Sequence, residues 1–147
     1  MKVGERVIPF NRISFDNGEM VRIREAVENG HISGDGPFTK KAEKMLSDIH
    51  DGARVLLASS CSHALELAAR LIGFEPGDEV IVPSFTFVTS VSSFVSNGAT
   101  PVFCDIDPLT LGLDLEEAQK LITPKTKAIV LVHYGGVPAN PEGFARL

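Results

Sequence analysis

Apolar residues recur along this chain in two patterns, one with the period of a helix and one of short unbroken runs. The helical pattern, with apolar side chains three and four residues apart, predicts helices over four segments: 19–28, 37–51, 63–72 and 114–122. Residues 85–96 also predict a helix, although they are rich in serine and β-branched side chains. The short runs, rich in Val, Ile and Leu, predict buried strands over 54–58, 79–83, 100–105 and 127–133.

These predicted strands and helices alternate. The alternation indicates an α/β fold with a mainly parallel sheet covered on both faces, which is a three-layer α/β/α arrangement. A chain of 147 residues without a low-complexity linker predicts one domain with no internal boundary. Ligands of such sheets bind outside the carboxyl ends of the strands. Three loops should meet there: 59–63, 84–87 and 133–136.

The junction between the predicted strand 54–58 and the next helix has the character of an anion site. Four small or polar residues, Ser59 to Ser62, join the two elements, and Gly73 ends the helix. The first amides of a helix have no carbonyl partner, and they lie at the positive end of the helix dipole. The junction therefore predicts a phosphate site, although helix capping by the serines alone explains the same residues.

Other candidate residues each have a chemical and a structural interpretation. Cys61 is either a nucleophile, with His63 or His133 as its base, or a small packed side chain. Phe87 either covers a planar ligand or belongs to the core. His133 is a ligand contact or a strand-end residue, and Asp35 is a site residue or a turn residue. Neither a G-x-G-x-x-G nor a G-x-S-x-G motif occurs after a predicted strand.

Composition narrows the function classes. The net charge of −5 and the lack of a Lys/Arg stripe argue against nucleic-acid binding. No apolar run approaches the ~18 residues of a membrane span, and residues 1–11 lack the apolar segment of a signal peptide. Cys61 and Cys104 stand in unrelated contexts, which suits a reducing compartment better than a disulfide framework. We therefore expect a cytoplasmic protein that binds neither nucleic acid nor a membrane and has no metal site.

Five blocks of sequence together resemble the DegT/DnrJ/EryC1/StrS family of sugar aminotransferases, which use pyridoxal 5′-phosphate (PLP). The resemblance covers residues 34–137. The blocks are GDGPFTKKAEK (34–44), SSCSHALELAA (59–69), PGDEVIVPSFTFV (76–88), GATPVFCDID (98–107) and ITPKTKAIVLVHYGG (122–136). The resemblance implies that residues 1–147 form the N-terminal part of the large domain of a type I PLP-dependent aminotransferase.

The resemblance also implies roles for individual residues. The family's S-G-T-x-A-L block matches residues 60–65, which implies that the Ser62 hydroxyl and the His63 backbone N–H hold the PLP phosphate. Cys61 stands in place of the usual glycine, which changes the backbone freedom at that point of the site. The family places an aromatic side chain over the PLP ring at the position of Phe87.

Three further residues match positions that we expect near the substrate: Asp35, His133 and Tyr134. The implied reaction is amino transfer from glutamate to a nucleotide-linked 4-keto-6-deoxy sugar. Such a reaction serves deoxysugar, lipopolysaccharide or other cell-surface polysaccharide biosynthesis. The resemblance implies a homodimer with residues from both subunits in each site.

Transamination needs a lysine that forms a Schiff base with PLP. In the family this lysine, and the carboxylate at the pyridine nitrogen, align beyond residue 147. Lys125 and Lys127 lie in a predicted loop and at a predicted strand start, and neither matches the family's Schiff-base lysine. We therefore expect no catalytic residue in this chain, and we expect the chain alone to be inactive. The alternatives are a hydrolase that depends on Cys61 and a non-catalytic remnant.

Overall fold

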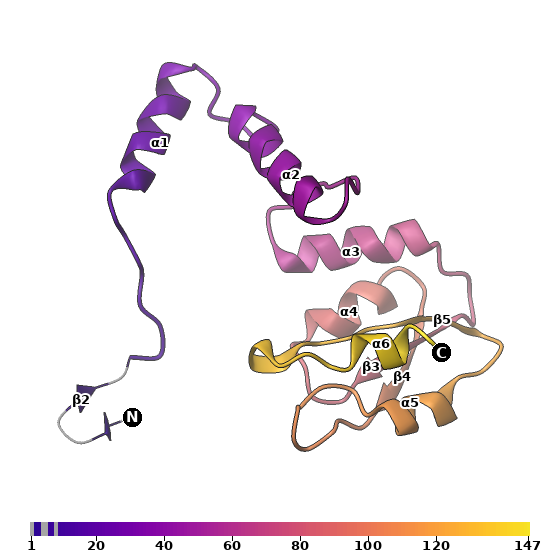
Figure 1. The fold of residues 1–147 in the computed structure, drawn as a ribbon. Helices are drawn as coiled ribbons and strands as arrows, with labels where there is room; N and C mark the ends of the chain where they lie inside the picture. Colours follow the sequence, from indigo (N-terminus) through magenta and orange to yellow (C-terminus); the bar gives the residue numbers. More distant parts are fainter. Residues whose placement is uncertain (1, 4–5, 8) are drawn as a thin grey trace. The chain divides into compact units, whose positions relative to one another are not determined.

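The computed structural model describes residues 2–3, 6–7 and 9–147, and its contacts divide the chain into two compact units, Met1–Leu57 and Ala58–Leu147 (Figure 1). The described part of the first unit forms a short antiparallel ribbon and two helices: β1 (Lys2–Val3), β2 (Arg6–Val7), α1 (Gly18–Glu28) and α2 (Pro37–Ile49). Both helices lie within two residues of the segments that the apolar pattern predicts. Pro37 begins α2, where its missing N–H leaves no hydrogen bond unmade.

The second unit, described throughout, alternates helices and strands. Its elements are α3 (Cys61–Ile72), β3 (Glu79–Pro83), α4 (Thr89–Val95), β4 (Thr100–Cys104), α5 (Leu115–Leu121), β5 (Thr126–Ile129), a 3₁₀ turn η1 (Tyr134–Gly136) and α6 (Pro141–Phe144). The strands form one sheet in the order β4-β3-β5, with both pairings parallel. The predicted α/β class with a mainly parallel sheet is confirmed.

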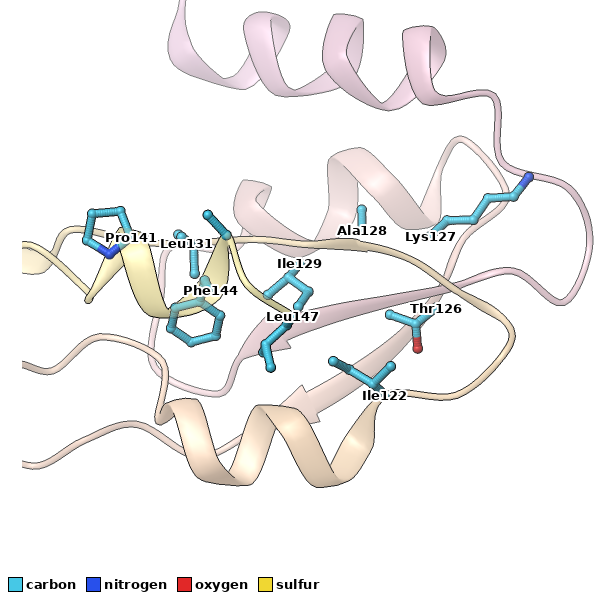
Figure 2. A pocket seen from close by; sticks show the side chains of 10 residues that line it. Ile122, Thr126, Lys127, Ala128, Ile129, Leu131, Pro141, Phe144 and Leu147 are labelled. Atoms are coloured by element: carbon cyan, nitrogen blue, oxygen red, sulfur yellow. The ribbon is translucent and has the colours of Figure 1, made fainter.

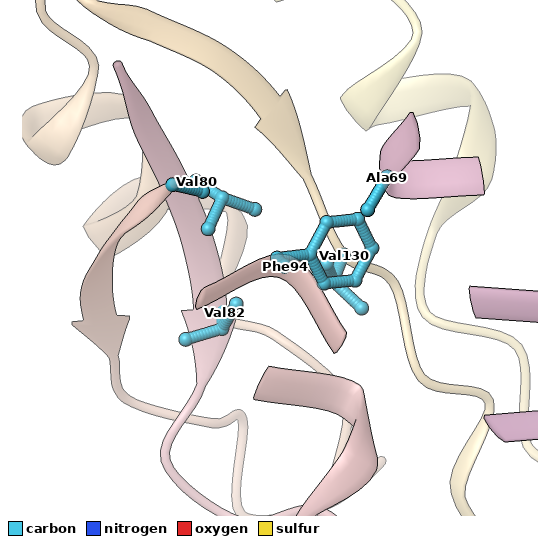
Figure 3. Packing of buried hydrophobic residues seen from close by; sticks show 6 residues of the cluster. Ala69, Val80, Val82, Phe94 and Val130 are labelled. Atoms are coloured by element: carbon cyan, nitrogen blue, oxygen red, sulfur yellow. The ribbon is translucent and has the colours of Figure 1, made fainter. Parts of the chain in front are cut away.

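Both faces of the central strand β3 are covered. Val80 and Val82 point to one face, where they pack with Ala69 of α3 and Phe94 of α4; Figure 3 shows the Phe94 ring among these side chains. Ile81 points to the other face and packs with residues of α5 and α6. Because successive side chains of one strand are buried against different helices, the unit has three layers, with the sheet in the middle.

The predicted strand 54–58 is not a strand in the structure. These residues pair with no other strand among the residues described, and the Leu56 side chain is 71% exposed. An apolar run becomes a strand only where another strand accepts its backbone hydrogen bonds. This segment crosses the boundary between the two units, and its one described long-range hydrogen bond joins the Leu57 N–H to a carboxylate oxygen of Glu43, at 3.4 Å.

Two other predicted elements are shorter than expected. The strand predicted over 127–133 ends at Ile129, although the Val130 N–H still donates to the Ile81 carbonyl at 2.9 Å. The next residue of β3 on that side is Pro83, which has no N–H to continue the ladder. The helix predicted over 85–96 begins only at Thr89, because the preceding residues form bends in which the Thr86 hydroxyl donates to Ser90 Oγ at 2.9 Å.

Polar contacts tie the strands together at the end of the sheet where β3 and β5 begin. Lys127 on β5 pairs with Asp78 at 2.8 Å, and the Thr123 hydroxyl donates to Glu79 at 2.6 Å. The hydrogen bond from Lys127, with a second from the Glu75 N–H, lowers the pKa of Asp78 below its ordinary value.

In the described part of the chain, no helix combines the length and the apolar character that crossing a membrane requires.

Replacing Ile81 by alanine should lower the free energy of unfolding of the second unit by about 2–5 kcal/mol, because the change leaves a cavity under a fully buried side chain. Urea denaturation followed by circular dichroism measures the effect. The control is Leu109→Ala, which removes a side chain that is 90% exposed in the same unit and should change stability by less than about 0.5 kcal/mol. Equal losses for the two variants would contradict the three-layer packing.

Candidate functional site

The first turn of α3 begins with a serine cap. Ser60 has an extended backbone, and its Oγ accepts a hydrogen bond from the His63 N–H at 3.2 Å. The helix therefore starts at Cys61, two residues earlier than the sequence predicts, and the capping interpretation of Ser60 is confirmed. The amides of Cys61 and Ser62 come before any carbonyl of the helix that can accept from them, and they lie at the positive end of the helix dipole.

Hydrogen bonds hold the Ser59 and His63 side chains and the Ser62 backbone of this turn. The Ser59 hydroxyl and His63 Nδ1 share a hydrogen bond of 2.7 Å. Ser62 is half-buried, and its carbonyl accepts a hydrogen bond of 3.5 Å from the hydroxyl of Ser93, a buried residue of α4. Cys61 is exposed. No residue from Cys61 to Ala64 carries a carboxylate, so the turn combines free amides and a hydroxyl without a competing negative charge.

The loops after β3 and β5 meet through an aromatic pair. The ring centroids of Phe85 and Tyr134 lie 4.7 Å apart, with an angle of 36° between their planes. This contact confirms that the loops 84–87 and 133–136 come together at the carboxyl end of the sheet. Phe85 was not among the site residues predicted from the sequence. Its position directly after Pro83-Ser84, where the predicted strand ends, could have indicated that it lies at this edge of the sheet.

Phe87 is not a core residue in this structure, because its side chain is 70% exposed. It lines an open cavity of about 400 Å³ at the carboxyl end of β3, together with Ser84, Thr86 and apolar side chains of α4 and β4. Residues 61–63 and 133–134 do not line that cavity. The structure therefore brings Tyr134 to the loop that carries Phe87, but it does not gather all the predicted cofactor residues around one cavity.

His133 has one ring nitrogen committed to the backbone. Its Nδ1 accepts a hydrogen bond from the Ala139 N–H at 3.1 Å, so in the neutral imidazole the proton lies on Nε2. A general base needs a free lone pair. Among the described contacts, neither His133 nor His63 bonds to Cys61, because His133 accepts from Ala139 and His63 bonds to Ser59. This arrangement does not favour the Cys61 hydrolase.

The second cysteine, Cys104, is buried at the end of β4. Burial, with a smaller contribution from the carboxylates of Asp114, Asp105 and Glu117, raises the pKa of the Cys104 thiol to about 11. Its Sγ lies 3.4 Å from the Asp105 carbonyl oxygen. Cys104 is therefore a packed thiol rather than a nucleophile.

Asp35 belongs to the first unit. It has a positive φ of 59°, in a turn between two glycines, and its carboxylate pairs with Lys40 at the start of α2. Lys40 also pairs with Glu43 at 3.2 Å, and the hydrogen bonds from Asp35 and Glu43 raise the pKa of the Lys40 ammonium. The turn interpretation of Asp35 agrees with this geometry, and its role near a substrate stays a prediction.

The outer edge of β5 borders a separate cavity of about 450 Å³ (Figure 2). Its lining is mostly apolar and includes Ile122, Ile129 and Phe144. In Figure 2 the Lys127 side chain extends away from the apolar group, and its amine pairs with Asp78. None of the predicted site residues lines this cavity in the described part of the chain, and no cluster of His, Cys, Asp or Glu that suits a metal ion occurs there either.

Comparison with known proteins identifies the family. Residues 14–146 match the DegT/DnrJ/EryC1/StrS aminotransferase family, which is most of the chain. This protein belongs to that family. The family resemblance predicted over residues 34–137 is therefore confirmed, and the match extends beyond that stretch at both ends.

Named relatives show how much of a family member the chain covers. It is 42% identical over 130 residues to dTDP-4-dehydro-2,3,6-trideoxy-D-glucose 4-aminotransferase of Saccharopolyspora spinosa, covering 86% of this chain and 33% of that protein. It is 40% identical over 121 residues to GDP-perosamine synthase of Caulobacter vibrioides, covering 82% of this chain and 33% of that protein. The chain thus spans about a third of the length of the curated relatives it matches.

A solved structure supports the fold assignment. The E. coli GDP-4-keto-6-deoxy-D-mannose-3-dehydratase with bound hydrated PLP has a TM-score of 0.86 and 26% sequence identity to this chain. The match covers 94% of this chain and 37% of that chain. The predicted α/β fold of this family is therefore confirmed.

In the folded protein at mildly alkaline pH, a thiol reagent should modify Cys61 quickly and Cys104 only after unfolding. Exposure controls the first reaction, whereas burial and a pKa of about 11 suppress the second. Mass spectrometry of alkylated peptides measures both, and Cys61→Ser is the matched control in which the fast reaction disappears. Fast modification of Cys104 in the native protein would contradict its buried position.

Proposed function

We propose that this chain is the N-terminal part of the large domain of a PLP-dependent sugar aminotransferase, and that it holds the phosphate of PLP at the first turn of α3. The observation that carries the proposal is the chemistry of this turn. The amides of Cys61 and Ser62 have no carbonyl partner within the helix, and they lie at the positive end of the dipole of a 12-residue helix. The half-buried Ser62 adds a hydroxyl to the same turn. These groups fit a phosphate and would not fit a cation.

The cap adds a detail to this proposal. The His63 N–H, which the family resemblance assigns to the phosphate, donates to Ser60 Oγ in this structure. A phosphate would therefore compete with the cap for this amide, while the amides of Cys61 and Ser62 stay available. The Ser93 hydrogen bond to the Ser62 carbonyl and the Ser59 contact to His63 hold the backbone and side chains of the turn in place.

Phe87 is proposed to cover the ring of the cofactor. Phe87 lies in the loop after β3, and its side chain is exposed. The neighbouring Phe85 packs against Tyr134 from the loop after β5. A large exposed aromatic side chain at the carboxyl end of a parallel strand is suited to stack on a planar ligand. When bound, PLP supplies the electron sink for the reaction, and the residues of this chain bind and orient it.

Replacing Ser62 by alanine should weaken PLP binding about tenfold or more, because a hydroxyl that donates to a charged phosphate is lost. Equilibrium dialysis of the 147-residue chain against PLP, and separately against inorganic phosphate, measures the change. Ser96→Ala is the matched control, since that hydroxyl donates to the Ser92 carbonyl at the far end of α4. Unchanged affinity in the Ser62 variant, or an equal loss in the control, would disprove the phosphate assignment.

The proposed substrate is a nucleotide-linked 4-keto-6-deoxy sugar, with glutamate as the amino donor. The name of the Saccharopolyspora relative, a 4-aminotransferase of a dTDP-linked deoxysugar, supports this class. The GDG, SC and VHYGG details of the sequence resemble those of TDP-4-amino-4,6-dideoxygalactose transaminases, which also supports this class. On the family resemblance, we propose that His133 and Tyr134 lie near the substrate, and the same resemblance is the only support for Asp35 as a substrate residue. We also propose a cytoplasmic homodimer that serves lipopolysaccharide or other deoxysugar biosynthesis.

The chain by itself should not catalyse amino transfer. None of its lysines matches the family's lysine motif, and Lys127 pairs with Asp78 at the opposite end of the sheet from the proposed site. The test incubates the 147-residue chain with PLP, glutamate and a TDP-4-keto sugar and follows 2-oxoglutarate. We expect no turnover above the level with heat-denatured protein. Turnover by the folded chain would overturn this part of the proposal and leave the phosphate assignment unaffected.

A further inference from the structure

The loop between β5 and α6 is closed by a side chain rather than by backbone pairing alone. His133 stands at its start, and its Nδ1 accepts the N–H of Ala139, six residues later, at 3.1 Å. We propose that His133 is a positioning residue: its neutral imidazole, held as the Nε2–H tautomer, closes the loop 133–139 and keeps Tyr134 against Phe85.

The donor of this hydrogen bond is itself held in place. Ala139 is 2% exposed. A Cβ atom at Gly112, in the loop after β4, would lie 2.6 Å from the Ala139 Cβ, so the two backbones approach as closely as glycine permits. Because Ala139 is packed against the body of the unit, its N–H is a fixed point to which His133 attaches the exposed end of the loop.

Closing the loop places the next residue. Tyr134 follows His133 directly and begins the 3₁₀ turn η1. Its ring packs against that of Phe85, with 4.7 Å between the ring centroids. Gly135 and Gly136 follow, with positive φ of 60° and 84°. Because glycine restricts the backbone less than other residues, these two do not by themselves hold the segment in one conformation. The hydrogen bond from Ala139 and the Phe85 ring therefore determine together where the Tyr134 ring lies.

His133 also has a hydrogen-bonding group for the substrate, and this part of the inference rests on the proposed function. With Nδ1 engaged, the remaining polar atom of His133 is the Nε2–H, which is a hydrogen-bond donor. It suits an acceptor oxygen of a phosphate or a sugar hydroxyl, and it does not suit proton removal from the substrate. His133 would thereby have two functions: Nδ1 is the acceptor that shapes the loop, and Nε2–H is a donor that stays available to a ligand.

The composition of the chain makes the loop directly observable, because Tyr134 is its only tyrosine and it has no tryptophan. Acrylamide quenching of tyrosine fluorescence in the 147-residue chain thus reports the exposure of Tyr134, which is 39% exposed in the structure. His133→Ala removes the acceptor, and the ratio of closed to open loop should fall about fivefold, as for one net hydrogen bond. The quenching constant should rise toward that of the unfolded chain.

The conservative variant separates this role from general destabilisation. In His133→Asn the amide oxygen takes the place of Nδ1 and accepts from Ala139, so quenching should stay near that of the wild type while the Nε2–H is lost. His50→Ala, at the exposed end of α2, is the control and should show no change. Circular dichroism of each variant confirms that it is folded.

Each outcome decides the proposal. Greater quenching in the alanine variant, together with retention in the asparagine variant, supports the clamp; if the alanine variant is unfolded, a folded asparagine variant with wild-type quenching still supports it. An alanine variant with unchanged quenching overturns it, as does an asparagine variant that is as exposed as the alanine variant or that is unfolded. No cofactor is added, so failure here leaves the phosphate assignment at Ser62 intact, and failure of that assignment leaves this result intact.

Discussion

The parallel pairing of β3 with both of its neighbours is the constraint on which the second unit depends. β3 lies between β4 and β5, and its side chains are buried on both faces of the sheet. A shift of the strand by one residue would move each buried side chain to the other face, so the pairing register of β3 is strongly specified. Its carboxyl end is therefore fixed, and so is the loop that follows it. The contact between Phe85 and Tyr134 is a consequence of this arrangement, since parallel strands deliver their following loops to the same edge of the sheet.

The proposed site combines two kinds of local order. The first turn of α3 is held by its Ser60 cap and by the buried Ser93 on α4, so its amides are oriented before any ligand arrives. Preorganised donors lose little entropy when an anion binds. The aromatic side chains of the loop 84–87 differ in this respect, because Phe85 packs against Tyr134 whereas Phe87 is largely exposed and available to a planar partner.

The sequence predicted those parts of the fold that local pattern determines. β3 is found at its predicted bounds, and Gly73 ends α3 in the left-handed conformation that favours glycine. The failures have long-range causes. Residues 54–58 are apolar enough for a strand but find no pairing partner among the residues described, and β5 stops early because Pro83 on the adjacent strand has no N–H. No sequence pattern predicts the hydrogen bond between His133 and Ala139, since neither its spacing nor its residue types recur along the chain.

The central claim, that a phosphate binds at the amides that begin α3, is tested most directly by mapping backbone amide shifts of the ¹⁵N-labelled protein during titration with PLP. We expect the largest shifts at Cys61 and Ser62, smaller shifts in the loop 84–87, and the same α3 shifts with inorganic phosphate. The first turn of α5, which begins with Asp114 and two glutamates, should not respond. Shifts that are absent from α3, or that are equally large at α5, would contradict the account.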